Sequence, residues 1–281
     1  MLEQAWLIPV FPIAAFLLIM VCGRFEPLRS RFVASGGWLA LIGVGASSAL
    51  SLLVAWEVFT GGHGPYEKTW TWFEGATFAF EGGIYLDGLA ALLLVVVSIV
   101  SFLVVMFSMG YMADEGDRRI RYYAEICLFV GVMHGLVLAN SFLLLFIFWE
   151  IMGLCSYLLI GFWYEKPSAA SAAKKAFLVT RVGDVFLLFG LVILFNTFGT
   201  LRYSELFADP AVLAEHATEL KWATLCLFGG AIGKSAQFPL HFWLPDAMEG
   251  PSTVSALIHA ATMVKAGVFL VARAYPLIVH S

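Results

Sequence analysis

The stretch FLLLFIFWEIMGLCSYLLIGFWY, residues 142–164, contains one charged side chain, Glu150. A helix that spans a bilayer needs about 20 mostly apolar residues, so this stretch predicts a transmembrane helix with a carboxylate well inside it. A charged side chain at that depth costs about 2.5–3.5 kcal/mol even on the mildest scale. Glu150 therefore needs a buried cationic partner or internal water. The alternative, that Glu150 has no function at this depth, is less favoured.

The whole chain has the composition of a membrane protein. Of its 281 residues, 61% are hydrophobic and only 13% are charged, against about 45–50% and about 25% in soluble domains. The net charge of −4 offers no basic surface for nucleic acid. Eight apolar runs predict an all-α bundle of about eight transmembrane helices, over Ala5–Cys22, Ser35–Phe59, Leu86–Met109, Tyr122–Leu138, Phe142–Tyr164, Ala176–Phe198, Trp222–Gln237 and Thr253–Ile278.

Lysine and arginine are distributed unevenly among the loops between these runs. Nine follow the first, third and fifth runs, whereas the intervening loops carry three and are otherwise acidic. The positive-inside rule therefore places the three basic loops in the cytoplasm and both termini outside. The nine residues are Arg24, Arg29, Arg31, Arg118, Arg119, Arg121, Lys166, Lys174 and Lys175.

The segment between the second and third runs predicts a small β-structure. Thr69–Phe73 and Ala76–Phe80 alternate polar or small residues with aromatic residues, and Glu74–Gly75 lies between them. This pattern is typical of a β-hairpin with a tight turn, here on the outer face over about residues 67–83. We expect a first unit of three helices and this hairpin over residues 1–121, and a second unit over residues 122–281.

Charged side chains inside the predicted spans are the best candidates for function. Arg181 and Asp184 are three residues apart, on one helix face within salt-bridge reach, and a structural pair and a functional pair are equally favoured. Arg273 lies near the end of its span, so we expect it to snorkel to the outer interface. The charged residues at this depth are Glu150, Arg181, Asp184, Lys234, Lys265 and Arg273.

Lys234 lies in GGAIGKSAQFPLHFWLP, residues 229–245, with glycines before it and Pro239 and Pro245 after it. Proline removes a backbone hydrogen bond and clashes with the preceding turn, so the seventh helix is expected to be broken. Broken helices at membrane depth occur where they are buried or line a water-filled cavity. A proton-relay lysine is the favoured interpretation, and a structural lysine that caps free carbonyl groups is the alternative.

His259 and Lys265 lie six residues apart in the last run. On a continuous helix they would face directions about 240° apart, at depths that differ by about 9 Å. This spacing suits two successive stations of a proton path better than one binding site. A histidine that is simply hydrogen-bonded to a neighbouring helix is the alternative for His259, and the favoured interpretation for His134.

Three stretches together resemble a known family, the large antiporter-like subunit of respiratory complex I. They are IYLDGLAALLLVVVSIVSFLVVMFSMGYM at residues 84–112, the run from LLLFIFWEIMGLC to DVFLLFG at residues 143–190, and GKSAQFPLHFWLPDAMEGPSTVSALIHAATMVKAGVFLVAR at residues 233–273. This subunit is called L in bacterial NADH–quinone oxidoreductase and chain 5 in mitochondria. Its members run to about twice this length, so we expect a fragment, a truncated form or part of a split subunit.

The resemblance implies a fold and a set of functional residues. The family fold contains two inverted repeats of five helices, each forming a half-channel, and residues 122–281 would form the first. Glu150, Lys234 and His259 fall on motif residues of the proton path, and Arg181 with Asp184 fall on an ion pair that supports it. We add Lys265 to the path. Many complex I members have a neutral residue at the position of Lys265. The large subunits of multisubunit sodium/proton antiporters look similar to this chain at that position.

The resemblance also implies a function, a location and partners. We expect a proton-translocating, multi-pass subunit in a bacterial plasma membrane, in contact with lipid and neighbouring antiporter-like subunits. The complex would be an enzyme, an NADH:quinone oxidoreductase, but this chain lacks a P-loop and a GxGxxG motif. NADH, FMN, iron–sulfur clusters and quinone are therefore expected in other subunits, with no cofactor or metal here. A cation/proton antiporter subunit and a structural membrane scaffold remain alternatives.

Overall fold

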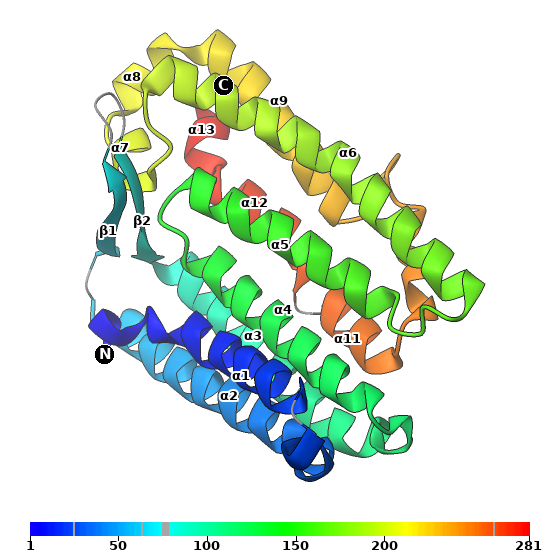
Figure 1. Ribbon diagram of the computed structural model, residues 1–281. Helices are drawn as coiled ribbons and strands as arrows, with labels where there is room; N and C mark the ends of the chain where they lie inside the picture. The colour runs from blue at the N-terminus through cyan, green and yellow to red at the C-terminus, as the bar shows by residue number, and fades with distance from the viewer. Residues whose placement is uncertain (25, 63, 75–78, 261) are drawn as a thin grey trace.

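The computed structural model describes residues 1–24, 26–62, 64–74, 79–260 and 262–281, and shows a bundle of long helices with one β-hairpin (Figure 1). The longer helices are α1 (Leu7–Arg24), α2 (Glu26–Thr60), α3 (Gly88–Tyr111), α4 (Arg118–Leu138), α5 (Phe142–Ile160), α6 (Pro167–Phe198), α9 (Ala217–Lys234), α11 (Ser252–Ala260) and α12 (Met263–Arg273). The shorter ones are α7 (Tyr203–Leu206), α8 (Pro210–Glu215), α10 (Trp243–Asp246) and α13 (Tyr275–Val279), with 3₁₀ turns at Leu2–Gln4, Ala113–Glu115 and Ala247–Glu249.

Seven helical segments within the described ranges are long and apolar enough to cross a membrane, so the chain is a multi-pass membrane protein. They are Leu2–Gly23, Gly36–Thr60, Gly88–Tyr111, Arg118–Leu138, Phe142–Ile160, Pro167–Phe198 and Ser252–Arg273. The expected seventh span corresponds to α9, which is not among them. Its 18 residues include three charged side chains, Glu219, Lys221 and Lys234.

The break expected in the seventh helix is present, and a second break was not expected. The helix α9 ends at Lys234, and the chain is non-helical until the short helix α10. The last predicted run is divided into α11 and α12, where the Thr262 hydroxyl donates a hydrogen bond to the Leu257 carbonyl at 2.6 Å. His259 and Lys265 therefore lie on two different helices of the span Ser252–Arg273, so the angle expected for one continuous helix does not apply.

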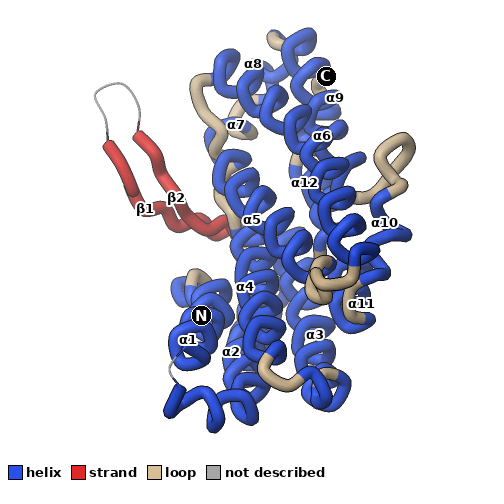
Figure 2. The backbone as a smooth tube through the Cα atoms, turned by 45° about the vertical axis from the view of Figure 1, so that its right-hand side comes forward, coloured by secondary structure: helices blue, strands red, loops and turns tan. Residues whose placement is uncertain are grey.

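The β-hairpin is confirmed and projects from one end of the bundle (Figure 2). Strand β1 (Tyr66–Glu74) pairs antiparallel with β2 (Ala79–Leu86). Both strands lie partly outside the predicted ranges, and the predicted Glu74–Gly75 turn includes residues outside the described part of the chain. Gly83 allows a close approach, because a Cβ atom there would lie 2.3 Å from the carbonyl oxygen of Lys68.

The most buried span, α4, packs against α1, α2, α3 and α5 (Figure 1). Its His134 side chain is completely buried and contacts two hydroxyl groups, Ser47 Oγ at 3.1 Å and Ser98 Oγ at 3.1 Å. These bonds join α4 to α2 and α3, which agrees with the structural interpretation of His134. Because α4 contacts helices on both sides of residue 121, the expected division into two units stays a prediction.

Glycine residues bring α6 and α9 into close contact. A Cβ atom at Gly183 would lie 2.9 Å from the Cα atom of Gly233, and one at Gly190 would lie 3.0 Å from the Ala223 carbonyl oxygen. Small residues allow membrane helices to approach in this way. Asp184 follows Gly183 in sequence, and Lys234 follows Gly233. The contact between these two glycines therefore positions a carboxylate beside a lysine.

Candidate functional site

Lys234 is completely buried at the last residue of α9. Its Nζ atom lies 3.5 Å from Oδ2 of Asp184, which is itself only 3% exposed. The other carboxylate oxygen of Asp184 accepts a hydrogen bond of 2.6 Å from the Trp149 indole nitrogen. A Cβ atom at Gly153 would lie 2.7 Å from the lysine Nζ, so glycine leaves room for the ammonium group. Three helices therefore enclose one buried ion pair.

A second ion pair lies beside the first. Arg181 on α6 pairs with Glu150 on α5, and the arginine is 37% exposed while the glutamate is 20% exposed. The guanidinium group also lies 4.6 Å from the ring centre of Phe177. Because Arg181 and Asp184 are one turn apart on α6, the two ion pairs are neighbours in the middle of the bundle.

The partners differ from the sequence-based expectation. The sequence predicted a local pair of Arg181 with Asp184, and Lys234 as the cation close to Glu150. Instead, Glu150 binds Arg181 while Asp184 binds Lys234. The close contact of α6 with α9 explains the difference, since it brings Lys234 to Asp184 and leaves Arg181 free to reach α5.

The interrupted end of α9 is stabilised by two side chains. Trp243 donates its indole hydrogen to the Gly233 carbonyl at 3.1 Å, and Ser235 donates its hydroxyl hydrogen to the Val264 carbonyl at 2.8 Å. The freed Gly233 carbonyl is thus bound by Trp243 and not by Lys234, while the Ser235 bond ties the end of α9 to α12. The lysine Nζ makes no hydrogen bond of good geometry within the described residues. Lys234 does not cap the helix, which counts against the purely structural alternative.

The structure does not bring His259 or Lys265 into this cluster. His259 is half-buried on α11, and both of its ring nitrogens are buried without a hydrogen-bond partner in the described part of the chain. Lys265 is exposed on α12. Neither side chain forms an ion pair with another described residue. Their assignment to the proton path stays a prediction.

Arg273 is buried and does not snorkel, so that prediction was wrong. It is only 4% exposed, and its two terminal nitrogens lie 2.5 and 3.0 Å from the carboxylate oxygens of Asp87. Three rings surround the guanidinium group at 5.0–5.2 Å, those of Tyr85, Tyr203 and Phe269. Asp87 also caps the first turn of α3 by accepting from Ala90 N. This carboxylate provides a nearby partner inside the bundle.

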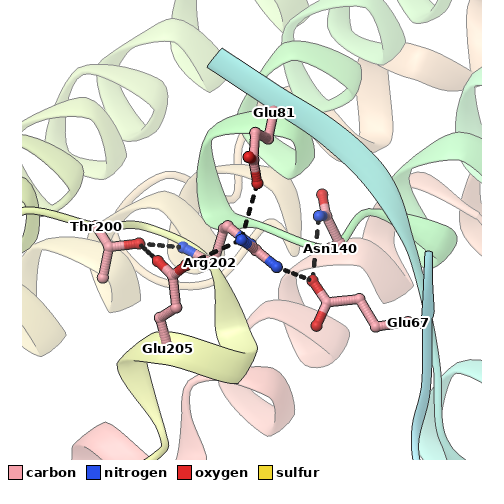
Figure 3. Close-up of polar contacts among 6 residues, drawn as sticks. All are labelled: Glu67, Glu81, Asn140, Thr200, Arg202 and Glu205. Atoms are coloured by element: carbon pink, nitrogen blue, oxygen red, sulfur yellow. Dashed lines mark hydrogen bonds and ion pairs between the residues drawn. The ribbon is translucent and has the colours of Figure 1, made fainter. Parts of the chain in front are cut away.

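A polar cluster joins the hairpin to the bundle (Figure 3). Arg202 binds Glu81 at 2.8 Å, Glu205 at 2.9 Å and Glu67 at 3.2 Å. Asn140 donates a hydrogen bond to the same Glu67 at 3.3 Å. Partial burial alone would lower the pKa of Arg202, but the hydrogen bond to Glu67 and the surrounding carboxylates raise it. The arginine therefore stays charged and holds both strands against the α6–α7 loop.

Sequence reasoning missed two buried residues. Trp149 was read as one more apolar residue, although its indole nitrogen is the hydrogen-bond donor to Asp184. Glu125 was not singled out, although it is only 8% exposed on α4 and pairs with Arg121 at 3.3 Å. The signal for Glu125 was present, because a glutamate four residues after an arginine lies on the same helix face.

Comparisons with known proteins agree with the geometry. Residues 139–281 match the family described as "NADH:quinone oxidoreductase/Mrp antiporter, TM". The chain belongs to this family. Residues 72–123 also match the family described as "NADH-Ubiquinone oxidoreductase (complex I), chain 5 N-terminus". The resemblance to the antiporter-like subunit L or chain 5 is confirmed.

Individual relatives place the chain within the family. It is 49% identical to NADH-quinone oxidoreductase subunit L of Escherichia coli, over 95% of this chain and 43% of that protein. It is 43% identical to F(420)H(2) dehydrogenase subunit L of Methanosarcina mazei, over 99% of this chain and 42% of that protein. The chain thus spans about two fifths of the length of these relatives.

A solved structure shares the fold. The Mrp complex from Dietzia sp. DQ12-45-1b superposes with a TM-score of 0.80 at 28% identity, over 95% of this chain and 28% of that chain. The helical bundle with its small hairpin is therefore the family fold, as the sequence predicted.

Proposed function

We propose that this chain is a proton-translocating membrane subunit of a complex of the NADH–quinone oxidoreductase type. The observation that carries the proposal is the completely buried Lys234, 3.5 Å from Asp184, at the end of an interrupted helix. A buried ion pair is costly unless its geometry and hydrogen bonds compensate for lost water. Here the lysine has no good hydrogen bond among described residues, and such a group is suited to exchanging its proton.

The two ion pairs provide a way to control that exchange. Coulomb attraction between unit charges about 4 Å apart is about 4 kcal/mol at an effective dielectric near 20, enough to favour the charged lysine. While Glu150 is ionised, it holds Arg181 away from Asp184. When Glu150 takes up a proton, Arg181 becomes free to bind Asp184 one turn along α6. Asp184 then attracts Lys234 less, and the buried lysine gives up its proton.

The later stations follow from position and chemistry. We assign His259 as the acceptor, because an unperturbed imidazole titrates near pH 6.5 and its nitrogens are not engaged by described residues. We assign Lys265 to the transfer of charge away from this chain, because its side chain is exposed on α12. An exposed lysine at membrane depth is costly in lipid, so a neighbouring protein surface is its expected environment.

The rest of the complex follows from the names of the relatives. One relative is named for NADH and quinone and another for reduced F420, so the electron donor is not fixed by this chain. We propose that donor, flavin, iron–sulfur and quinone sites lie in other subunits. We also propose that neighbouring antiporter-like subunits cover exposed helix faces, and that the complex lies in a bacterial plasma membrane with the hairpin outside.

A second candidate function is that of a large subunit in a cation/proton antiporter. The shared fold with the Mrp complex and the presence of Lys265 favour it. The higher identities to subunits of an NADH-quinone oxidoreductase and of an F(420)H(2) dehydrogenase favour the first function. A structural scaffold is the third alternative, and it does not explain a buried lysine whose ammonium group makes no good hydrogen bond to described residues.

The functions separate when the assembled complex is reconstituted into vesicles and supplied with donor and quinone. We expect acidification of one side that follows donor oxidation and needs no sodium. Lys234→Ala should abolish it, whereas the matched control Lys221→Ala, exposed on the same helix, should not. Sodium-dependent acidification without donor oxidation would establish the antiporter instead, and full pumping by Lys234→Ala would leave only the scaffold.

A further inference from the structure

A second buried carboxylate lies nearer the basic loops than the central ion pairs. Glu125 on α4 is 8% exposed, and its Oε1 atom lies 3.3 Å from Nε of Arg121. Its Oε2 atom is buried and makes no hydrogen bond to any described residue. Arg121 is itself held elsewhere, since it donates to the Phe162 carbonyl and lies 4.9 Å from that residue's ring centre. Half of the Glu125 carboxylate is thus left without a protein partner.

Glu125 lines a cavity. The cavity has a volume of about 250 Å³ and lies among α4, α5, the α5–α6 loop and the start of α6. Its polar lining consists of Arg121, Glu125, Tyr157, Tyr164 and Lys174. A water molecule occupies about 30 Å³ in the liquid, so the cavity has room for several. Lys174 is exposed, which places the mouth of the cavity at the basic-loop end of the bundle.

The far wall of the cavity is close to the central site. Tyr157 lines the cavity, and Gly153, which contacts the Lys234 ammonium group, lies one turn earlier on the same face of α5. One turn of helix is about 5.4 Å long. Cys155, between them in sequence, lies within electrostatic range of both Glu125 and Lys234.

Two aromatic rings separate the cavity from the other central pair. The ring centres of Tyr157 and Phe177 are 5.5 Å apart, and the Phe177 ring contacts the Arg181 guanidinium group at 4.6 Å. The cavity therefore ends at a thin wall, with both ion pairs of the central site behind it.

We propose that Glu125 and this cavity form a proton-loading site that supplies the central lysine from the basic-loop end. Glu125 takes a proton from cavity water, and the proton then passes along water beside Tyr157 to the central site. Arg121 and Lys174 are the cations that line the cavity beside Glu125. Tyr157 and Tyr164 also line the cavity, and the Cys155 thiol lies within electrostatic range of Glu125. This inference rests on the proposed function.

The test compares variants of the assembled complex in vesicles. Glu125→Gln should slow proton pumping roughly a hundredfold, the lower end of what a positioned proton-transfer group contributes. Glu125→Asp should restore most of the rate. The control Glu165→Gln removes the same charge from an exposed pair with Arg118 at the same end of the bundle, and should pump normally.

A second pair of variants tests the cavity without changing any charge. Ala170 lines the cavity, so Ala170→Leu should fill it and slow pumping, whereas Ser171→Leu, exposed one residue along, should not. Full-rate pumping by Glu125→Gln or by Ala170→Leu would overturn the inference. If Glu125→Gln fails to assemble, Ala170→Leu decides.

The outcome for Lys234→Ala separates this inference from the proposed function. If Lys234→Ala stops pumping and Glu125→Gln does not, only the loading site is wrong. If Lys234→Ala pumps at the full rate, the proposed function itself fails.

Discussion

At the scale of single residues, the site depends on one carboxylate that serves two donors. Asp184 accepts from the Trp149 indole on one oxygen and pairs with Lys234 on the other. A hydrogen bond to a charged group contributes about 1.5–3 kcal/mol. The tryptophan therefore competes with the lysine for the same negative charge, and it limits how tightly the lysine is held.

This competition predicts the effect of Trp149→Phe. Without the indole donor, Asp184 should hold Lys234 more tightly and proton release should slow about tenfold, which corresponds to about 1.4 kcal/mol. The measurement is the initial rate of acidification in vesicles that contain the assembled complex. Trp163→Phe is the matched control, because it removes an indole hydrogen bond to Glu115 outside the central site. Equal rates for the two variants would show that Trp149 does not tune the lysine.

Sequence reasoning identified the charged residues of the site but not their pairing. Glu150, Arg181, Asp184 and Lys234 stand out because charge is rare in apolar runs. Within one helix, spacing predicts neighbours, and it suggested Arg181 with Asp184. Partners on different helices depend on how far each helix is shifted along the bundle, which no periodicity records. Trp149 was missed because an indole nitrogen is not visible in a count of charges.

At the scale of helices, the close contact of α6 with α9 positions the site. Hydropathy predicted the long spans and alternation predicted the hairpin, because both depend on local residue patterns. The break between α11 and α12 was missed because HAATMVKAG, residues 259–267, contains no proline. At the break the Thr262 hydroxyl donates to the Leu257 carbonyl, a local side-chain contact that hydropathy does not predict.

The glycine contact predicts the effect of Gly183→Ala. The added methyl group would meet the Gly233 backbone at 2.9 Å, so the helices must separate. Overpacking costs about 1–3 kcal/mol, and the Lys234–Asp184 pair should weaken with it. We expect a lower melting temperature of the assembled complex and slower pumping.

The control is Gly110→Ala on α3, because its added methyl group would meet nothing within 4 Å. Equally small effects of Gly183→Ala and Gly110→Ala on melting temperature and pumping would contradict the role of the glycine contact.

At the scale of the whole molecule, the two ends of the bundle carry different charged groups. The hairpin and the Arg202 cluster lie at one end, and the basic loops and the Glu125 cavity lie at the other. The positive-inside rule predicts that the basic end lies in the cytoplasm. Under the proposed function, a loading site at that end and a central lysine would together give proton movement a direction, from the cytoplasm outward.

This orientation is testable with single cysteines in sealed spheroplasts. Thr69→Cys on β1 and Ser168→Cys at the start of α6 are both exposed positions at opposite ends. We expect a membrane-impermeant maleimide to label Thr69→Cys at once, and Ser168→Cys only after the membrane is opened. The reverse pattern would mean that the chain is inserted the other way and that the Glu125 cavity opens outward.

The central claim is that the charge of Glu150, through Arg181, controls the proton on Lys234. The most direct test is the number of protons pumped per donor molecule oxidised by the assembled complex carrying Glu150→Gln. Glu219→Gln, exposed on α9, serves as the control. The account predicts that Glu150→Gln assembles but pumps almost no protons through this chain, while Glu219→Gln keeps the full ratio. An unchanged ratio in Glu150→Gln would contradict it.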